Sequence, residues 1–249
     1  MHLRVLLRPD TGMINVKNLR KTYGDVVAVD DISFEAKKGD ILGFIGPNGA
    51  GKTTTLRILS CFIEPDSGTA SVGGFDIRTQ PVAVRRVLGY VSEKCPFYGE
   101  MTPRWFLKFV CDVRGINGTR FKSEIDRVAA ISSLQGVMDR RIETLSKGFQ
   151  RRLGLAQSLL GDPPVLILDE PMSGLDPNQK QEIIDLIRFM AADKCFILST
   201  HVMEELETIC NRAILISKGK IVADSTPQDF KEKGHGKIDA FFRKVTNGN

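Results

Sequence analysis

The sequence predicts an α/β fold that is interrupted by a helical segment. Two short apolar runs, Asp40–Ile45 and Val165–Leu168, have the length and the β-branched content of buried strands. A glycine-rich turn and a helical pattern follow the first run directly, which is the first half of an α/β unit. The stretch 95–160 between the two runs is rich in helical patterns instead. These observations indicate one α/β unit into which helices are inserted.

Short strands and then helices are expected through the first part of the chain. The strands are expected at Ile14–Val16, Asp31–Phe34 and Asp40–Ile45, and a helix at Lys52–Ser60. Thr102 and Pro103 form a good N-cap and first-turn pair, and Gly115 ends the helix that they begin. Helical spacing continues over Glu124–Leu134 and Gly148–Leu160.

Strands and helices alternate again after the insert. The expected elements are a strand at Val165–Leu168, a helix at Pro177–Met190, a strand at Phe196–Leu198, a helix at Met203–Cys210, and strands at Arg212–Ser217 and Ile221–Ala223. Asp176 is the expected N-cap of the first of these helices. The polar segment Glu232–Lys237 is expected to be a loose segment.

The composition is that of an ordinary globular protein. Of 249 residues, 42% are hydrophobic and 26% are charged, which excludes the disordered, collagen-like and disulfide-scaffold classes. The net charge of +5 permits an anionic partner such as a phosphate ligand without requiring one. Five cysteines lie far apart with no CxxC pair, which indicates free thiols in a reducing, cytosolic compartment.

No segment of the sequence has the length of a membrane span. The longest apolar run, around Val165–Leu168, is far shorter than the roughly 18 residues that a spanning helix needs. The first ten residues are too short and too polar for a secretory signal. We expect residues 1–12 to be an N-terminal extension, with Met13 as an alternative start.

A phosphate-binding turn is predicted at GPNGAGKT. The pattern GxxxxGK[ST] between a strand and a helix identifies a P-loop. Its glycines let backbone N–H groups close around a polyphosphate, while Lys52 bridges the β- and γ-phosphates and the Thr53 hydroxyl ligates Mg²⁺. The predicted nucleotide-binding residues of this turn are Gly46, Pro47, Asn48, Gly49, Ala50, Gly51, Lys52, Thr53 and Thr54. ATP and Mg²⁺ are therefore the expected ligands.

Two acidic residues directly follow the buried strand Val165–Leu168. A P-loop protein places its Mg²⁺-holding carboxylate here, and Asp169 fits that role. Glu170, one residue further, is suited to act as general base toward an attacking water. Two acids after a strand are often only a solvated turn, but their combination with a P-loop favours the catalytic interpretation.

The insert ends in a further motif, Leu145-Ser-Lys-Gly-Phe149. It resembles the LSGGQ signature of the ATP-binding subunits of ABC transporters, with Lys147 and Phe149 as departures. The resemblance covers nearly the whole chain. At the family's Q-loop position this sequence carries Glu93, where most members carry glutamine.

The resemblance implies a role for each matching residue. The signature, which contacts the nucleotide of a partner chain, is Leu145, Ser146, Lys147, Gly148 and Phe149. The D-loop is Ser173, Gly174, Leu175 and Asp176. Tyr23 stacks on adenine, and Glu170 and His201 are catalytic. The residues that hold the metal are Thr53, Glu93 and Asp169.

The same resemblance implies an architecture. The fold is α/β, with a P-loop NTPase (RecA-like) core, an N-terminal antiparallel β subdomain and an inserted α-helical subdomain. The discontinuous core covers 13–94 and 158–249, and 95–157 is the helical subdomain with the signature. The chain is expected to form a homodimer or heterodimer around two Mg²⁺-ATP molecules. It is expected to drive integral-membrane permease subunits from the cytoplasmic face of the cell membrane.

Two details extend the resemblance. Glu93, the short chain and the SKGF-type signature look most like the ABC-2-type exporters, which include drug, sodium, polysaccharide and gliding-related systems. Family members present a groove to the permease after the Q-loop. The aromatic residues there are Phe97, Tyr98, Trp105, Phe106 and Phe109. Of these, Phe97 and Tyr98 are expected to be exposed.

Two other functions are compatible with the motifs. A soluble ABC-type ATPase acting on ribosomes or DNA would use the positive charge, but the single set of motifs and the lack of room for a long coiled coil oppose it. No nucleic acid partner is therefore expected. A nucleotide-binding regulator without hydrolysis is opposed by the complete set of catalytic residues, whereas Glu93 and Lys147 keep it open. ATP binding without turnover would select the regulator.

Overall fold

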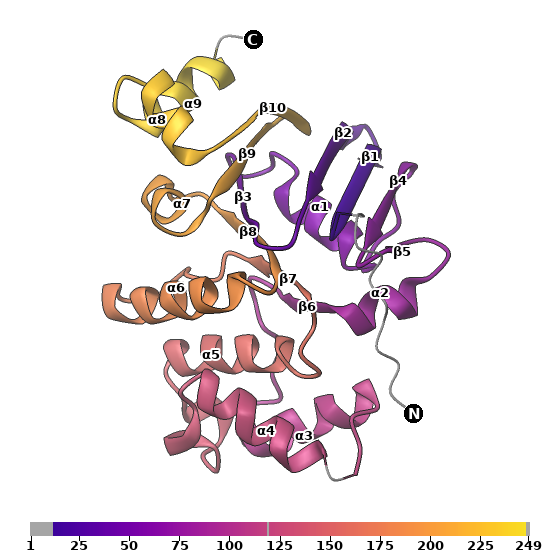
Figure 1. Cartoon of the computed structure of the whole chain (residues 1–249), viewed down its shortest axis with the longest axis vertical. Helices are drawn as coiled ribbons and strands as arrows, with labels where there is room; N and C mark the ends of the chain where they lie inside the picture. The colour runs from indigo at the N-terminus through magenta and orange to yellow at the C-terminus, as the bar shows by residue number, and fades with distance from the viewer. Residues whose placement is uncertain (1–11, 119, 248–249) are drawn as a thin grey trace.

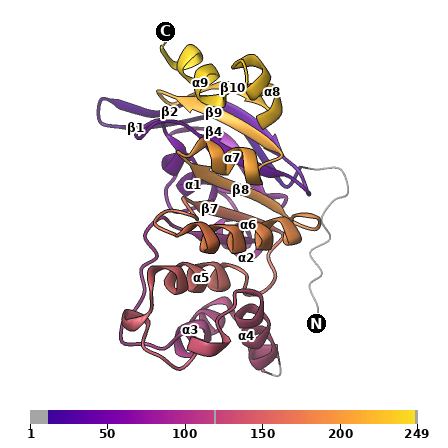
Figure 2. The ribbon, with the colours of Figure 1, turned by 90° about the vertical axis from the view of Figure 1, so that its left-hand side faces the viewer.

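The fold is seen in a computed structural model that describes residues 12–118 and 120–247 (Figure 1). Of the extension expected over 1–12, only Gly12 belongs to the described residues. Figures 1 and 2 agree that the inserted helices lie at one end of the molecule and the last two helices at the other. The sheets lie between these ends.

Two sheets organise the core. The six-stranded sheet has the order β10-β9-β3-β8-β7-β6, and the four-stranded sheet has the order β2-β1-β4-β5. The strands of the larger sheet are β3 (Ile41–Ile45), β6 (Leu88–Val91), β7 (Val165–Asp169), β8 (Cys195–Thr200), β9 (Arg212–Ser217) and β10 (Lys220–Ser225). The strands of the smaller sheet are β1 (Ile14–Tyr23), β2 (Val26–Ala36), β4 (Ser67–Val72) and β5 (Phe75–Asp76). The pairs around β3, β7 and β8 are parallel, and those of the smaller sheet are antiparallel.

Helices cover the sheets and form the insert. In the insert lie α3 (Pro103–Arg114), α4 (Arg120–Ile131), two short 3₁₀ turns (Gln135–Val137 and Ile142–Thr144) and α5 (Lys147–Ser158). The others are α1 (Lys52–Leu59), α2 (Pro81–Val87), α6 (Pro177–Ala191), α7 (Met203–Ile209), α8 (Pro227–Lys233) and α9 (Ile238–Asn247). The expected antiparallel β subdomain and helical insert are thus present, which confirms the predicted fold class.

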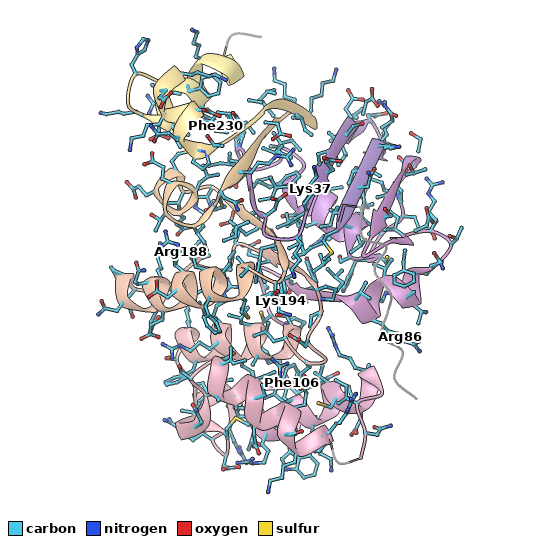
Figure 3. All side chains as sticks on the ribbon, in the orientation of Figure 1. Lys37, Arg86, Phe106, Arg188, Lys194 and Phe230 are labelled. Atoms are coloured by element: carbon cyan, nitrogen blue, oxygen red, sulfur yellow. The ribbon has the colours of Figure 1, made fainter. Side chains whose placement is uncertain are left out.

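Alternate residues of the central strands face two different cores. In β7, Leu166 and Leu168 pack with the insert and with α6, whereas Val165 and Ile167 pack toward the smaller sheet and α1. A strand that is buried on both faces is apolar on both, which is why the first four residues of β7, Val165–Leu168, form a continuous apolar run. Figure 3 labels Phe106 and Phe230, buried side chains at the two ends of the first core.

Local signals set several helix ends as predicted. The Thr102 side chain accepts a hydrogen bond from the backbone N–H of Trp105, Pro103 is the first residue of α3, and Gly115 ends it with φ +70°. Asp176 caps α6 in the same way. The expectation of a loose segment over Glu232–Lys237 was partly wrong, because α8 continues to Lys233 and α9 begins at Ile238.

Candidate nucleotide-binding site

A cleft of about 400 Å³ lies where the strands β3, β7 and β8 end. Parallel strands expose their carboxyl ends at one edge of a sheet, and ligands of open α/β sheets bind at this edge. The lining residues are Tyr23, Val26, Ala28, Asn48, Gly49, Ala50, Gly51, Lys52, Thr53, Thr54, Glu93, Glu170, Ser173 and His201. The cleft thus brings together predicted residues from five separate segments of the chain.

The P-loop backbone follows the path predicted from its glycines. Gly51 has φ +106°, and a Cβ atom there would lie 2.3 Å from the backbone oxygen of Ala28. No other residue fits this position without moving the backbone. Lys52 is the first residue of α1, so the P-loop leads directly into the N-terminus of that helix. This loop fits a polyphosphate.

Lys52 is buried at the base of the cleft. Its Nζ donates to the backbone oxygens of Gly46 at 2.6 Å and of Pro47 at 3.1 Å. Burial lowers the pKa of Lys52 from its ordinary value, and the charges of Glu170 and Asp169 partly oppose this shift. The ammonium group is therefore held by the loop that would surround the phosphates.

Asp169 is buried beside the start of α1. Its Oδ1 accepts hydrogen bonds from the Ser199 hydroxyl at 2.5 Å and from the Thr53 hydroxyl at 3.3 Å. Asp169 and Ser199 are paired residues of β7 and β8, so strand register fixes this contact. Carboxylate and hydroxyl oxygens suit Mg²⁺, which is commonly held by one or two carboxylates together with substrate phosphates. The donor set of Asp169 and Thr53 fits this ion.

Glu93 is less closely associated with these donors. Its side chain is exposed, and it lines the same cleft as Thr53. Among the residues that the structure describes, no three His, Cys, Asp or Glu side chains gather into a group that would hold a metal by themselves. The role of Glu93 in metal binding therefore remains a prediction.

Glu170 and His201 meet across the cleft. His201 Nδ1 lies 2.9 Å from Glu170 Oε2. An ionised carboxylate only accepts hydrogen bonds, so Nδ1 must carry the hydrogen when Glu170 is charged. A neutral ring then has no second N–H, so in this arrangement the hydrogen of His201 points at Glu170.

The backbone of Glu170 has an uncommon conformation. Its φ is +50°, in the left-handed region that non-glycine residues seldom adopt. Its N–H donates to the Ser199 hydroxyl at 3.0 Å, and its carbonyl accepts from Arg151 at 2.9 Å. Such a backbone persists only when its surroundings hold it, and it occurs often at active sites.

Tyr23 lies at the outer edge of the cleft. Its side chain is 48% exposed, and the Lys21 ammonium lies 5.7 Å from the centre of its ring. The neighbouring residue Thr22 is anchored to Asp66 by its N–H and by its hydroxyl, at 2.7 and 2.6 Å. The ring is therefore partly open to solvent at this edge of the cleft, and its stacking on adenine remains a prediction.

The predicted signature residues lie on a different part of the molecule. Of the described residues that line the cleft, none belongs to Leu145–Phe149. Ser146 caps α5 by accepting from the N–H of Phe149 at 3.4 Å, and it is exposed together with Lys147. Gly148 faces α6, where an added Cβ would lie 2.7 Å from the Gln179 side chain. The chain does not bring its own signature to its own P-loop.

The D-loop connects the two regions. Ser173 lines the nucleotide cleft and also a neighbouring cleft of about 350 Å³ that contains Lys147. Its N–H donates to the Glu170 carbonyl at 3.2 Å, while Leu175 is buried and Asp176 caps α6. The segment from Glu170 to Asp176 thus runs from the cleft to the side of the molecule that carries the signature.

The aromatic residues after the Q-loop form an exposed patch that differs from the predicted one. Tyr98 is 58% exposed, but Phe97 is half-buried because its ring packs against Phe106 at 5.2 Å. The expectation that Phe97 is exposed was therefore wrong. Trp105 and Phe109 are one helical turn apart on α3 and are 65% and 43% exposed. We call Tyr98, Trp105 and Phe109 the aromatic patch.

Two residues that sequence reasoning missed contact the catalytic segment. Ser199 joins Asp169 to the backbone of Glu170. Its signal was available, since Ser199 and Thr200 end an apolar strand immediately before His201. Arg151 contacts the Glu170 carbonyl from α5, and no pattern in the sequence distinguishes it from its neighbour Arg152.

Comparison with known proteins agrees with this geometry. The model of the ABC transporter family matches residues 29–173. A probable multidrug ABC transporter ATP-binding protein of Escherichia coli, YbhF, is 37% identical over 224 residues, which are 90% of this chain and 39% of the relative. The doxorubicin resistance ATP-binding protein DrrA of Mycobacterium tuberculosis is 34% identical over 230 residues, which are 91% of this chain and 70% of the relative.

A solved structure shares the fold. The ATP-binding cassette MJ0796, in a dimeric post-hydrolysis state bound to ADP and phosphate, superimposes with a TM-score of 0.79 at 21% identity. The match covers 86% of this chain and 99% of that chain. The two chains therefore share their fold over most of this chain.

Proposed function

This chain belongs to the ABC transporter family as an ATP-binding subunit, and we propose that it hydrolyses ATP in a head-to-tail dimer that drives a separate membrane permease. The observation that carries the proposal is the separation of two half-sites. The P-loop, Glu170 and His201 line one cleft and Asp169 contacts Thr53 beside it, whereas the signature on α5 lies outside the cleft. A second chain that supplies its signature would complete each cleft.

The residues of the cleft divide the chemistry among themselves. The P-loop N–H groups and Lys52 bind the phosphates, and Tyr23 stacks on the base. Thr53 and Asp169 would hold Mg²⁺, which neutralises charge on the phosphates when it is bound. Glu170 accepts a proton from the water that attacks the terminal phosphate, while His201 holds the Glu170 carboxylate in place. The products are ADP and phosphate.

The signature would contribute from the partner chain. Ser146 and Lys147 begin a 12-residue helix whose N-terminus is exposed. Such a helix end attracts anions through its free N–H groups and its dipole. The P-loop at the start of α1 already provides this environment for the nucleotide of the same chain. The exposed second N-terminus is thus suited to a nucleotide that another copy or a related chain binds.

A permease partner is supported by the surface of the insert. The aromatic patch exposes three large rings, and exposed apolar patches mark sites of protein contact. No helix within 12–118 and 120–247 is long and apolar enough to cross a membrane. The names of the multidrug and doxorubicin-resistance relatives suggest export as the direction of transport. We place the chain on the cytoplasmic face of the membrane, bound to that permease.

The experiment that tests the dimer is the mass of the Glu170→Gln chain in solution, with and without Mg²⁺-ATP. The amide cannot accept a proton, so a closed ATP-bound dimer should accumulate instead of turning over. We expect the mass to double with Mg²⁺-ATP and to remain that of a monomer with Mg²⁺-ADP. A chain that binds ATP and stays monomeric would contradict the self-completed dimer, and unchanged hydrolysis would exclude Glu170 as the base.

The permease partner needs a separate test. Trp105→Arg should leave ATP hydrolysis by the isolated chain unchanged and should reduce its sedimentation with membranes of the source cell. Phe189→Arg is the matched control, because Phe189 is 82% exposed but lies on α6, which is not part of the insert. Equal loss for both variants would argue against the aromatic patch as the docking surface.

A further inference from the structure

Arg151 occupies an unusual position between the insert and the nucleotide cleft. It belongs to α5, and its side chain is buried, with 9% of the residue exposed. One guanidinium nitrogen, Nη1, donates to the backbone oxygens of Ser92 at 3.2 Å and Glu93 at 3.1 Å. The other, Nη2, donates to the backbone oxygen of Glu170 at 2.9 Å. A single cation thus joins two loops.

The two loops follow neighbouring parallel strands. β6 ends at Val91 and β7 ends at Asp169, and Val91 pairs with Leu168 in the sheet. Beyond these residues the ladder hydrogen bonds stop, so the sheet no longer fixes the distance between the loops. The Arg151 guanidinium replaces the missing ladder, because it is rigid and planar and presents its donors in a fixed arrangement.

No carboxylate of the described residues lies within ion-pairing distance of Arg151. Among the described residues, Arg151 forms no ion pair, whereas its neighbour Arg152 pairs with Glu182 of α6. A buried charge without a counter-ion depends on its hydrogen bonds. All three carbonyls must stay in place to satisfy this cation, which makes a separate movement of either loop unfavourable.

Glu170 is the residue that needs such support. Its backbone has φ +50°, its N–H contacts Ser199 and its carboxylate contacts His201. The carbonyl is the remaining backbone group; it accepts from the N–H of Ser173 and from Arg151, which is the only one of these two donors that also binds the loop of Glu93. We propose that Arg151 is a positioning residue, which sets the direction of the Glu170 carboxylate through the backbone and ties it to the loop that carries Glu93. This inference rests on the proposed role of Glu170 as the base.

A consequence follows for the surface of the insert. The loop that begins at Ser92 continues through Cys95 to Tyr98 of the aromatic patch, and an added Cβ at Gly154 of α5 would lie 2.6 Å from the Cys95 sulfur. This loop is therefore packed tightly on the helix that carries Arg151. A displacement of the loop would act on the same guanidinium that holds Glu170, which gives a physical route between the patch and the cleft.

The test compares Arg151→Lys with Arg114→Lys. Arg114 on α3 is a matched control, because its partners among the described residues are also carbonyls, those of Leu160 at 3.0 Å and Leu88 at 3.3 Å, and it is not one of the described residues that line the cleft. In the full chain we expect Arg151→Lys to lower kcat for ATP by about a hundredfold, as a small misplacement of a catalytic group does. KM for Mg²⁺-ATP should stay within about twofold, because the phosphate and base contacts are untouched. Arg114→Lys should change neither constant.

Two further measurements separate positioning from stability. The urea midpoints of both variants show whether their folded states are equally stable. For Arg151→Ala, added guanidinium ion at concentrations that leave the wild type folded should restore part of kcat, whereas ammonium should not. A kcat within about threefold of wild type for Arg151→Lys, or equal losses in the two lysine variants, would overturn the inference.

A failure of the inference about Arg151 can be distinguished from a failure of the proposed role of Glu170. If Glu170→Gln still hydrolyses ATP, the assignment of the base fails and the inference about Arg151 fails with it. If Glu170→Gln is inactive and Arg151→Lys is fully active, Glu170 remains the base and only the positioning role is excluded.

Discussion

The nucleotide cleft and the signature helix differ in whether their polar groups find partners within the same chain. In the cleft, Lys52 contacts the P-loop carbonyls, Asp169 accepts from two hydroxyls, and Glu170 contacts His201. The N-terminus of α5 instead presents Ser146 and Lys147 to the surface, next to a cleft that the D-loop also lines. In the first region these side chains are paired within the chain, whereas the second region is open to the surface.

The difference indicates where each region obtains its partners. Buried polar groups must be paired within the fold, which is why the cleft residues are held by strand register and by the P-loop backbone. Exposed helix N–H groups are satisfied by water until an anion replaces it. Variants of the phosphate-binding residues in the first region should therefore lose both binding and turnover, whereas variants in the second region should lose turnover alone.

The largest effect is expected in the cleft, for Lys52→Met. Turnover should fall by about a hundredfold or more, because a preorganised charge on the phosphates is lost. Weaker binding of Mg²⁺-ATP should accompany this loss. The matched control is Lys194→Met, since Lys194 is also buried and donates to Asp162 at 2.6 Å and to the Pro163 oxygen at 2.9 Å. Steady-state kinetics and equilibrium ATP binding measure both variants, and an equal loss of turnover in the control would make Lys52 merely structural.

The signature helix should respond differently to Ser146→Arg. This variant should bind Mg²⁺-ATP normally and lose turnover, because the bulky cation blocks contact with the partner's nucleotide. Ser123→Arg is the control, a serine exposed on α4 of the same insert. We expect an equal mixture of Ser146→Arg and Lys52→Met chains to regain about a quarter of wild-type turnover, since half of the dimers contain one intact composite site. No recovery in the mixture would contradict the self-completed dimer.

The comparison also separates what local sequence patterns predict from what they do not. The strand, turn and helix from Ile41 to Leu59 could be predicted because one short segment contains an apolar run, the glycines of the turn and the P-loop pattern. The placement of Asp169 beside Thr53 follows from the same P-loop chemistry. The contact between Asp169 and Ser199 depends on the register of β7 with β8, which no local pattern contains.

Surface exposure and weak elements were the least predictable features. Phe97 was expected on the surface, but its exposure depends on the position of Phe106 across the insert. The helix α2 (Pro81–Val87) and the strands β4 and β5 were not predicted, because they are short and lack a clear apolar period. Arg151 was not singled out since its three partners come from distant segments.

The third effect contrasts two glycines. Gly51→Ala should lower the free energy of unfolding by about 1–3 kcal/mol, the range for strained backbone, because φ is +106° and the Ala28 backbone oxygen blocks the new Cβ. Gly148→Ala should cost less than about 1 kcal/mol, because the obstacle is the flexible end of the Gln179 side chain. Urea unfolding of the two variants measures the difference. A greater loss for Gly148→Ala would show that the signature helix is packed more rigidly than the P-loop.

The smallest expected effect is a change in how stability depends on pH, and it concerns two exposed carboxylates, one in each region. Asp66 lies below the Tyr23 end of the cleft, where hydrogen bonds from Lys21 and Thr22 hold the pKa of its carboxyl group well below the usual range. Asp139 lies in the insert, where a hydrogen bond from Arg104 also lowers the pKa of its carboxyl group. A group whose pKa is depressed by folding stabilises the protein above its unfolded pKa, and this contribution is lost as the pH falls below about 4.

Asp66→Asn and Asp139→Asn should therefore both make stability less dependent on pH on the acid side. The change should be larger for Asp66, because Lys21 and both donors of Thr22 act on its carboxylate, whereas Arg104 alone acts on Asp139. Urea midpoints measured from pH 3 to pH 7, a range that brackets the usual pKa of Asp, test this order. If the urea midpoint of either variant fell more steeply at acid pH than that of the wild type, the carboxyl group in question would not stabilise the fold in its charged form. An effect confined to Asp139 would move the acid-sensitive contact from the nucleotide cleft to the insert.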